Sequence, residues 1–352
     1  MKLYFLTTLV MMLGLSSYAQ SLDEKIRQTL KNYLTEFPSQ TQFSVALIDH
    51  EDTYYYGQVK FSDTINKLDN SASVFQIGSV TKVFTSTLLA SLVVDKTLKL
   101  TDSLQQFFRF PLANTSIMLE RLSNHTSGLP RLPSNLNLAL ADPKNPYLNY
   151  TEADLEFYLT TEMELQNTTE PSYQYSNLGA GILANVLENA TDKTFDDLLS
   201  EKIFQPLGMK NSTLDSNLVE SNLVQGLDQD GNPTPVWDMG VLAGAGGVLS
   251  STADLSKFVK AHFEDTETAF SLTTLPTFLV NPNLRIGLGW HILQDEQGHD
   301  LYWHNGGTGG YSASVFVIPE IQKAVIVLTN VSAFHPNASR IDELGFKLLS
   351  AF

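Results

Sequence analysis

The sequence predicts an α/β fold of the α+β type, in which one antiparallel β-sheet is flanked by N- and C-terminal helices and a mostly helical region is inserted between its strands. Strand-like runs of aromatic and β-branched residues occur near both ends of the chain, at about residues 43–61 and 286–330. The long segment between them is rich in helix-like runs and loops. With 352 residues, 43% of them hydrophobic, the chain is long enough to bury such a core.

The terminal elements follow from the spacing of apolar residues. "SLDEKIRQTLKNYLTEF" (21–37) has an apolar residue every three or four positions and predicts an amphipathic helix. "FSVALIDH" and "TYYYGQVKF" predict a β-hairpin with its turn at Glu51-Asp52. Four further runs, "IGLGWHILQ", "DLYWHNG", "SASVFVIPE" and "KAVIVLTN", predict a meander, and "SRIDELGFKLLSAF" predicts a closing helix.

The simplest packing joins the hairpin and the meander in one sheet. We therefore expect a sheet subdomain built from about residues 20–78 and 266–352, and a helical subdomain from about 79–265. Together they form one domain over residues 20–352, and a binding site is expected at the seam between the two subdomains.

The first nineteen residues are typical of a cleaved secretory signal peptide. Lys2 precedes an apolar run from Leu3 to Leu15, and Ser17 and Ala19 give a small-x-small ending. The run is too short to span a bilayer and no second one follows, so we expect an exported protein, periplasmic or secreted, without a membrane span after cleavage. The absence of cysteine means that no disulfide supports the fold.

Charge and motif content exclude several classes of partner. A net charge of −16 repels nucleic acid and anionic membrane surfaces, which favours a small-molecule or short peptide substrate. The seven histidines form no H-x-x-x-H or H-E-x-x-H pair, and no Walker-type G-x-x-x-x-G-K occurs. We expect neither a metal nor another cofactor; the oligomeric state stays open.

The first motif of chemical interest is "QIGSVTKVFT" (76–85). Lys82 follows Ser79 at i+3, which on a helix places both side chains on one face within hydrogen-bond reach. A lysine removed from water loses part of its preference for the charged form and can accept the serine proton. The simpler interpretation is an N-cap serine followed by a solvated lysine, and for this motif alone it is the more common one.

The second motif is Tyr175-Ser176-Asn177, directly before an apolar helix. A tyrosine relays protons if nearby cations lower its pKa, and an asparagine can hold a substrate amide through its donor and its acceptor. The simpler alternative is a helix start capped by Ser176 or Asn177.

The third motif is "WHNGGTGGYSASVFVI" (303–318). It places four glycines before a strand, Gly306 and Gly307 among them, which is more than a turn needs. Glycines let a ligand backbone approach closely, so an extended substrate can pair with this strand edge while His304 points into the cleft as a hydrogen-bond donor. The alternative is a glycine-rich hairpin with an incidental histidine.

In this order, S-x-x-K, Y-S-N and H-x-G resemble the serine β-lactamase and penicillin-binding-protein superfamily. The tyrosine is similar to that of the class C branch, with its D,D-carboxypeptidase, D-aminopeptidase and esterase relatives. "LSNHTSGLP" (122–130), "IFQPLGMKNSTL" (203–214) and "GAGGVLSSTADLSKFV" (244–259) also resemble segments of this superfamily. The resemblance covers nearly all of residues 20–352 and implies a β-lactamase/transpeptidase-like fold.

The resemblance implies a role for each motif residue. Ser79 would be the acylated nucleophile and Lys82 its proton acceptor. Tyr175 would assist proton transfer to the leaving group and activate the deacylating water, and Asn177 would bind the substrate amide. The backbone N–H groups of Ser79 and Gly307 would form the oxyanion hole, with His304 and Gly306 in the substrate-binding strand.

Two departures from the superfamily pattern limit the choice of substrate. His304 stands where the β-lactamases have a lysine, which weakens the case for efficient β-lactam hydrolysis and favours peptidase or esterase activity. Ser172 replaces an expected glycine in a loop. The sequence thus predicts a serine hydrolase acting on β-lactams or D-amino-acid-containing peptides; a carboxylesterase or a slowly deacylating penicillin-binding sensor remains the alternative.

Overall fold

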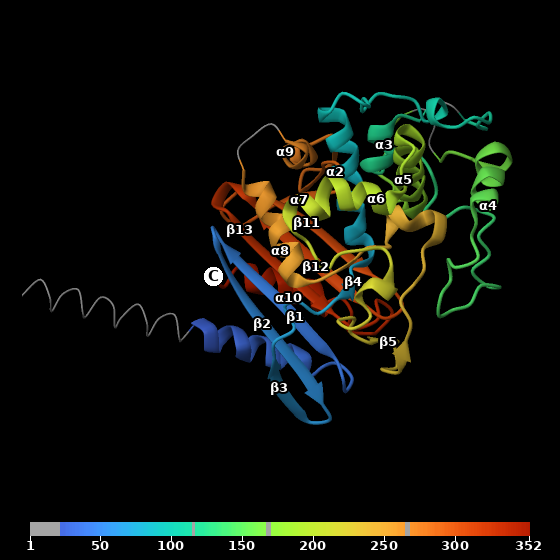
Figure 1. Ribbon diagram of the computed structural model, residues 1–352. Coiled ribbons are helices and arrows are strands. Elements are labelled where there is room, and N and C mark those ends of the chain that lie inside the picture. The colour runs from blue at the N-terminus through green and yellow to red at the C-terminus, as the bar shows by residue number, and fades with distance from the viewer. Residues whose placement is uncertain (1–21, 115–116, 167–169, 265–267) are drawn as a thin grey trace, which may run out of the picture.

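The computed structural model describes residues 22–114, 117–166, 170–264 and 268–352. Within them, one nine-stranded antiparallel sheet has the spatial order β3-β2-β1-β13-β12-β11-β10-β9-β8 (Figure 1). Its strands are β1 (Gln42–Asp49), β2 (Asp52–Phe61), β3 (Thr64–Leu68), β8 (Phe278–Asn281), β9 (Leu284–Ile286), β10 (His291–Gln294), β11 (Asp300–Gly307), β12 (Ser312–Ile318) and β13 (Lys323–Thr329). The predicted signal sequence lies outside the described residues.

The two ends of the chain meet in this sheet, as predicted. β1 pairs with β2 as a hairpin and, on its other side, with β13, so that Val45 lies opposite both Tyr56 and Val327. The predicted antiparallel sheet, built from both ends of the chain, is therefore confirmed.

The sequence analysis missed strands β3 and β8 at the two edges of the sheet. All five side chains of β3 are exposed or half-buried, and in β8 none is fully buried. Edge strands with so little burial lack the alternating apolar pattern on which strand prediction depends. The predicted single strand "IGLGWHILQ" is in fact interrupted between β9 and β10.

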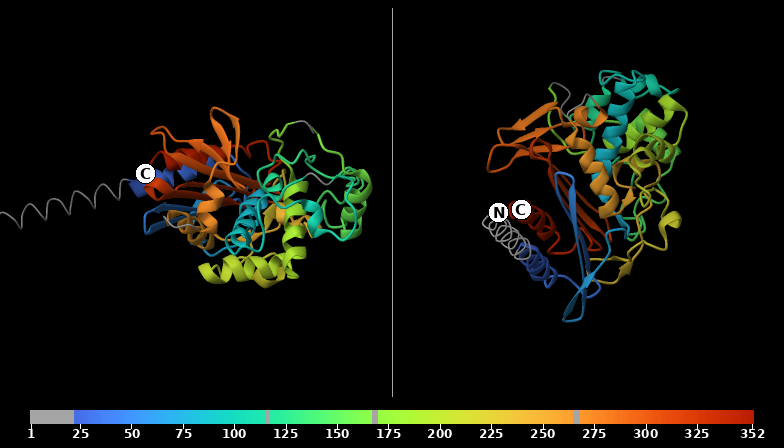
Figure 2. Two further views of the ribbon diagram at one scale, coloured as in Figure 1. Left: turned by 90° about the horizontal axis from the view of Figure 1, so that it is seen from above. Right: turned by 60° about the vertical axis from the view of Figure 1, so that its left-hand side comes forward.

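Each face of the sheet is covered by helices, which explains why the central strands β1, β12 and β13 are buried at nearly every position. The N-terminal helix (residues 22–34) and α10 (Arg340–Leu349) lie together on one face, and the helical region lies on the other (Figure 2). Along β12 alternate side chains enter different cores: Val315 packs toward the helical region and Phe316 toward the terminal helices. All seven residues of β12 are buried.

The helical region surrounds α2, whose apolar and polar residues are buried on nearly all sides. A serine caps α5, where Ser176 Oγ accepts the N–H of Gly179 at 2.8 Å. The helices after the N-terminal one are α2 (Thr81–Val94), α3 (Leu119–Ser123), α4 (Glu152–Phe157), α5 (Asn177–Thr191), α6 (Phe195–Leu199), α7 (Gln205–Leu207), α8 (Thr252–Lys260), α9 (Ala269–Thr274) and α10. Short ladders join β4 (Phe75–Gln76) to β7 (Leu249–Ser250) and β5 (Gly226–Leu227) to β6 (Pro233–Thr234).

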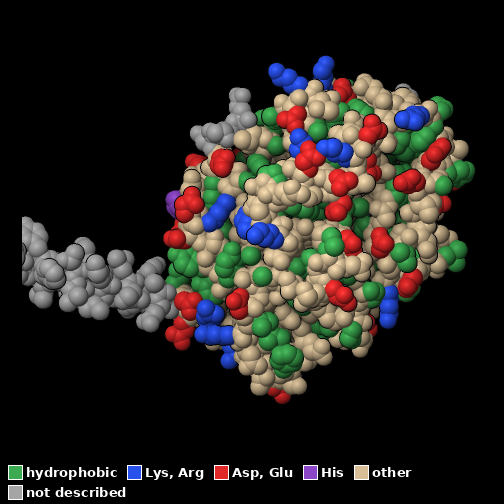
Figure 3. Space-filling view, in the orientation of Figure 1, with side chains coloured by type: hydrophobic (Ala, Val, Ile, Leu, Met, Phe, Trp, Pro, Cys, Tyr) green, Lys and Arg blue, Asp and Glu red, His purple; other side chains and the backbone are tan. Residues whose placement is uncertain are grey.

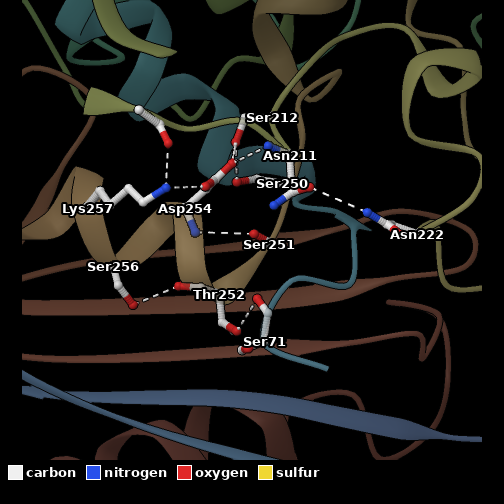
Figure 4. Close-up of polar contacts among 11 residues, drawn as sticks. Ser71, Asn211, Ser212, Asn222, Ser250, Ser251, Thr252, Asp254, Ser256 and Lys257 are labelled. Atoms are coloured by element: carbon white, nitrogen blue, oxygen red, sulfur yellow. Dashed lines mark hydrogen bonds and ion pairs between the residues drawn. The ribbon is translucent and has the colours of Figure 1, made fainter. Parts of the chain in front are cut away.

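A buried polar group fixes α8 to the loop after α7, and we call it the Asp254 cluster: Asn211, Ser212, Ser250, Asp254 and Lys257 (Figure 4). Asp254 is 0% exposed. One carboxylate oxygen accepts the N–H of Asn211 at 2.6 Å and the hydroxyl of Ser212 at 3.0 Å, and the other accepts Lys257 Nζ at 2.9 Å. The buried charge is therefore compensated by three donors.

The acidic side chains do not gather in a single patch on the face of the molecule shown in Figure 3. On the face shown in Figure 3, acidic side chains are spread among neutral, apolar and a smaller number of basic ones. In the part of the chain that the structure describes, no helix combines the length and the apolar character needed to cross a membrane.

Candidate active site

Ser79 lies in a tight 3-10 turn (Gly78–Val80) between β4 and α2, packed against the end of β11. Gly78 has φ +52°, which a residue with a side chain rarely adopts, and a Cβ on it would lie 2.5 Å from Gly307 N. Gly306 is equally constrained, because its Cβ would lie 1.9 Å from Ile77 O. Glycines on both segments thus let the turn that carries Ser79 approach the strand.

Lys82 lies in the first turn of α2 and is 1% exposed. Its Nζ lies 3.0 Å from Ser79 Oγ and donates to Ala245 O at 2.7 Å. Burial, with a smaller effect of the Arg131 charge, lowers the pKa of Lys82 well below its usual value. The amine is therefore biased toward the neutral form, which can accept a proton from the adjacent hydroxyl.

Tyr175 lies between two basic side chains. Lys82 Nζ is 4.9 Å and Arg131 Cζ is 5.1 Å from the centre of its ring. The sequence analysis named one condition for proton transfer by this tyrosine, a pKa lowered by nearby cations. Removal from water has the larger effect and raises the pKa of Tyr175, although a hydrogen bond with Ser79 and the charge of Arg131 act in the opposite direction. That condition is not met, and Tyr175 is a neutral phenol that can donate its proton.

The end of β11 presents an open edge beside Ser79. β12 pairs with β11 from Tyr302 to Gly307, whereas β10 reaches only Trp303. Thr308 N–H donates to Tyr311 O at 2.9 Å; since bonded and non-bonded pairs alternate in an antiparallel ladder, the N–H of Gly307 points away from β12. The N–H of Gly307 is thus directed to the side from which a substrate can approach.

His304 differs from its predicted orientation. It is 1% exposed, and its Nδ1–H donates to Asn305 O at 2.6 Å. Its Nε2 is then the bare nitrogen of the neutral ring; this atom is buried and has no hydrogen-bond partner. Burial, with the neighbouring His291 and Lys82, lowers the pKa of His304 well below its usual value. His304 therefore supplies neither a positive charge nor a free N–H to the cleft.

Two further histidines surround Tyr175, and the sequence analysis did not assign either to the site. The centre of the His125 ring is 4.4 Å from that of the Tyr175 ring, and the φ of 61° at His125 is typical of a turn. The ring of His291 stacks on Tyr175 at 6.5 Å and lies 5.2 Å from His304. His291 Nε2 is 2.8 Å from the hydroxyl of Tyr173.

A cavity of about 570 Å³ opens at this point. Ser79, Tyr175, Gly306 and Gly307 line it, whereas Lys82 and His304 are buried behind its wall. Asn177 does not line it; its Oδ1 is buried without a partner. The cavity is also lined by residues that the sequence analysis missed: Arg131, Tyr173, His291, Trp303, Asn305, Ser312, Ala313, Ala333, Ala338, Ser339, Ile341 and Asp342.

A serine beside a neutral lysine and a neutral tyrosine, at the open edge of an antiparallel sheet, defines the class of acyl-transferring serine hydrolases with a β-lactamase-like fold. The Beta-lactamase family model matches residues 17–349, and the chain belongs to that family. It is a serine hydrolase whose structural neighbours include class C β-lactamases.

Individual relatives are similar over most of the chain. The unguisins hydrolase of Aspergillus campestris is 27% identical over 347 residues, which cover 89% of this chain and 62% of that protein. The D-alanyl-D-alanine-carboxypeptidase/endopeptidase AmpH of Escherichia coli is 26% identical over 305 residues, 80% of this chain and 77% of AmpH. The chain thus spans less than two thirds of the fungal hydrolase.

A solved structure supports the fold. The β-lactamase/D-alanine carboxypeptidase of Pseudomonas syringae superposes with a TM-score of 0.78 at 20% sequence identity, over 94% of this chain and 99% of that one.

Proposed function

We propose that this protein is an exported hydrolase that forms an acyl-enzyme at Ser79 with β-lactams or with peptides and amides that contain D-amino acids. The observation that supports it best is the buried Lys82, whose Nζ lies 3.0 Å from Ser79 Oγ and whose pKa is lowered by burial. A buried amine with no carboxylate partner costs stability, and its use as a base accounts for its retention. The relation to a D-alanyl-D-alanine-carboxypeptidase supports this class of substrate.

Acylation follows from the protonation states. Ser79 Oγ attacks the substrate carbonyl while its proton passes to neutral Lys82. The N–H groups of Ser79 and Gly307 stabilise the oxyanion.

The intermediate then collapses. As the C–N bond breaks, the phenol of Tyr175 donates its proton to the leaving nitrogen, and protonated Lys82 restores that proton. Water hydrolyses the acyl-enzyme by the same transfers in reverse. Asn177 does not line the cavity in this structure, but its Oδ1 has no protein partner, and we propose that it accepts the N–H of the acyl amide when substrate is bound.

A carboxylesterase is the second candidate, and a specific observation favours it. His304 is neutral and buried, so β11 lacks the fixed cation that a β-lactam carboxylate would meet in a lysine-containing third motif. Ester hydrolysis does not need that charge, because a simple ester carries no carboxylate that must be bound.

Intact-mass spectrometry separates these candidates. The protein is incubated briefly with benzylpenicillin and, separately, with p-nitrophenyl acetate, and product release is followed. We expect a Ser79-dependent adduct or product that Ser79→Ala abolishes completely while its thermal unfolding is unchanged. Ser312→Ala is the matched control because Ser312 lines the same cavity but donates to Val331 O, and it should still form the adduct.

Each outcome has a distinct meaning. A stable penicillin adduct indicates a slowly deacylating penicillin-binding protein, and rapid product release indicates a β-lactamase or peptidase. Ester turnover without any reaction with penicillin favours the carboxylesterase. Turnover that persists in Ser79→Ala disproves the acyl-enzyme at this residue.

A further inference from the structure

Arg131 is held at a fixed place beside the proposed active site. It directly follows the segment 122–130, and its carbonyl oxygen accepts the N–H of Asn177 at 3.0 Å and that of Leu178 at 3.1 Å. These two bonds satisfy free donors at the start of α5. The backbone of Arg131 is therefore anchored to the residue that we propose to hold the substrate amide.

The side chain of Arg131 remains available to a ligand. It is exposed, it lines the same cavity as Ser79, and its guanidinium lies over the ring of Tyr175. Within the described residues, no carboxylate lies within ion-pair distance of it, whereas Arg27, Arg285 and Arg340 each form ion pairs. Arg109 and Arg121 likewise form no ion pair among the described residues, but neither lines the cavity, so the position of Arg131 distinguishes it.

The acidic residue on the cavity wall does not serve as its partner. Asp342 accepts hydrogen bonds from Asn305 Nδ2 and Ser314 Oγ, both at 2.7 Å. These donors belong to β11 and β12, so the carboxylate is committed to the sheet. Arg131 keeps its charge uncompensated by protein groups.

The fixed positive charge of the cavity thus lies at a different place from that of a lysine in the third motif, which would stand at the position of His304 on β11. His304 is neutral, and Lys82 is neutral in the form that acts as a base. The planar guanidinium of an arginine such as Arg131 is a cation that can bind a carboxylate through two parallel hydrogen bonds. The guanidinium lies over the ring of Tyr175, on a residue whose backbone is bonded to Asn177, rather than on β11.

We propose that Arg131 makes this enzyme select substrates whose acyl group carries a carboxylate. The inference rests on the proposed function, because the acyl side is assigned from Asn177, which holds the acyl amide there. A carboxylate on the acyl chain, a few bonds from the reacting carbonyl, would reach the guanidinium while the carbonyl oxygen occupies the oxyanion hole.

Paired esters test this preference. Mono-p-nitrophenyl glutarate carries a terminal carboxylate, and p-nitrophenyl valerate is of similar length and neutral. We expect a higher kcat/KM for the glutarate ester, and in Arg131→Gln we expect the ratio of glutarate to valerate to fall about 10-fold or more, mainly through KM. Arg131→Lys should retain part of the preference because the charge remains.

The matched control is Arg109→Gln, which removes an exposed arginine outside the cavity with the same change in net charge. It should leave the ratio at the wild-type value. A ratio that falls equally in both variants would reflect general electrostatic attraction and would overturn the assignment to Arg131.

The remaining outcomes separate the two hypotheses. If neither ester shows Ser79-dependent hydrolysis, the proposed function fails. If both are hydrolysed and the ratio is the same in wild type and Arg131→Gln, the inference about Arg131 alone fails.

An equal loss of kcat/KM for the glutarate and valerate esters in Arg131→Gln also overturns the inference, because Arg131 would then act by positioning Tyr175. Phenyl acetate and 4-acetoxybenzoate, which differ by a carboxylate on the leaving group, provide the last arm. If Arg131→Gln changes the kcat/KM ratio only for this second pair, the carboxylate that Arg131 binds lies on the leaving group, which contradicts the proposal.

Discussion

Two buried polar regions of the same domain differ in how completely their hydrogen bonds are made. In the Asp254 cluster, the buried carboxylate accepts bonds from a backbone N–H, a hydroxyl and an ammonium group. Around Tyr175, in contrast, four buried side-chain atoms lack a partner: His125 Nε2, Asn177 Oδ1, His291 Nδ1 and His304 Nε2.

This difference distinguishes structural from functional polar groups. Native proteins satisfy nearly all buried polar atoms, since each one left without a partner costs about 1–3 kcal/mol. A group of such atoms around a base and a nucleophile is consistent with a site that is completed by substrate or water. The Asp254 cluster should therefore support stability, and the residues around Tyr175 should support turnover at some cost in stability.

The largest expected effect comes from Lys82→Met, which replaces the buried amine with an apolar side chain of similar length. Turnover should fall roughly 10²-fold or more, as expected when a proton acceptor is removed. The melting temperature should stay the same or rise, because the variant no longer buries an ionisable group. Steady-state kinetics and thermal unfolding measure the two effects.

Lys257→Met is the matched control for this substitution. Lys257 donates to Asp254 and its side chain is 43% exposed. It should leave kcat/KM within about twofold of wild type and cost about 1–3 kcal/mol of stability, because the buried carboxylate of Asp254 loses one of its donors. A variant of Lys82 that unfolds readily, or a loss of turnover in Lys257→Met, would contradict the distinction between the two regions.

The second expected effect concerns Asp254→Asn. The new amide keeps the size of the carboxylate but presents an NH₂ group to donors from Asn211, Ser212 and Lys257. The free energy of unfolding should fall by about 2 kcal/mol, since one or more buried donors lose their acceptor. Urea denaturation at constant pH measures it.

The activity of Asp254→Asn provides the check. At a temperature where the variant is fully folded, its kcat/KM should equal that of wild type. A variant that is stable but inactive would mean that the cluster participates in the site.

The sequence predicted the parts of the site that local spacing determines. Ser79 and Lys82 are three residues apart on one turn, so their contact follows from helical geometry. The central strands of the sheet could also be predicted from the sequence, because burial on both faces gives them runs of mostly apolar residues.

Other parts depend on contacts between distant segments. Arg131 and His291 reach Tyr175 from a loop and from β10, and neither stands in a motif that indicates such a contact. The rise in the pKa of Tyr175 also depends on burial that no local pattern reports. For this reason the sequence alone did not show in which direction the pKa of Tyr175 is shifted, and it did not predict that Arg131 lines the cavity.

The smallest expected effect is on acid stability, and it again contrasts the two regions. Burial lowers the pKa of His291 from 6.5 to about 4 and lowers those of His125 and His304 well below 6.5. At a pH between the lowered pKa of a folded-state histidine and its ordinary value of 6.5, the unfolded chain binds more protons than the folded one. Stability is therefore fully present above about pH 6.5 and is lost as the pH falls toward about 4. Thermal unfolding measured from about pH 7.5 to about pH 5 should show this loss.

His291→Gln should remove a share of that loss. One pKa unit corresponds to about 1.4 kcal/mol, and because His291 lines the cavity and is partly solvated we expect a share of about 1 to 2 kcal/mol at about pH 5. His50→Gln is the matched control, since His50 lies on the surface beside Asp49. If His291→Gln loses as much stability as wild type and His50→Gln when the pH falls, His291 is not held in its neutral form. The unpartnered nitrogen atoms would then no longer distinguish the active site from the Asp254 cluster.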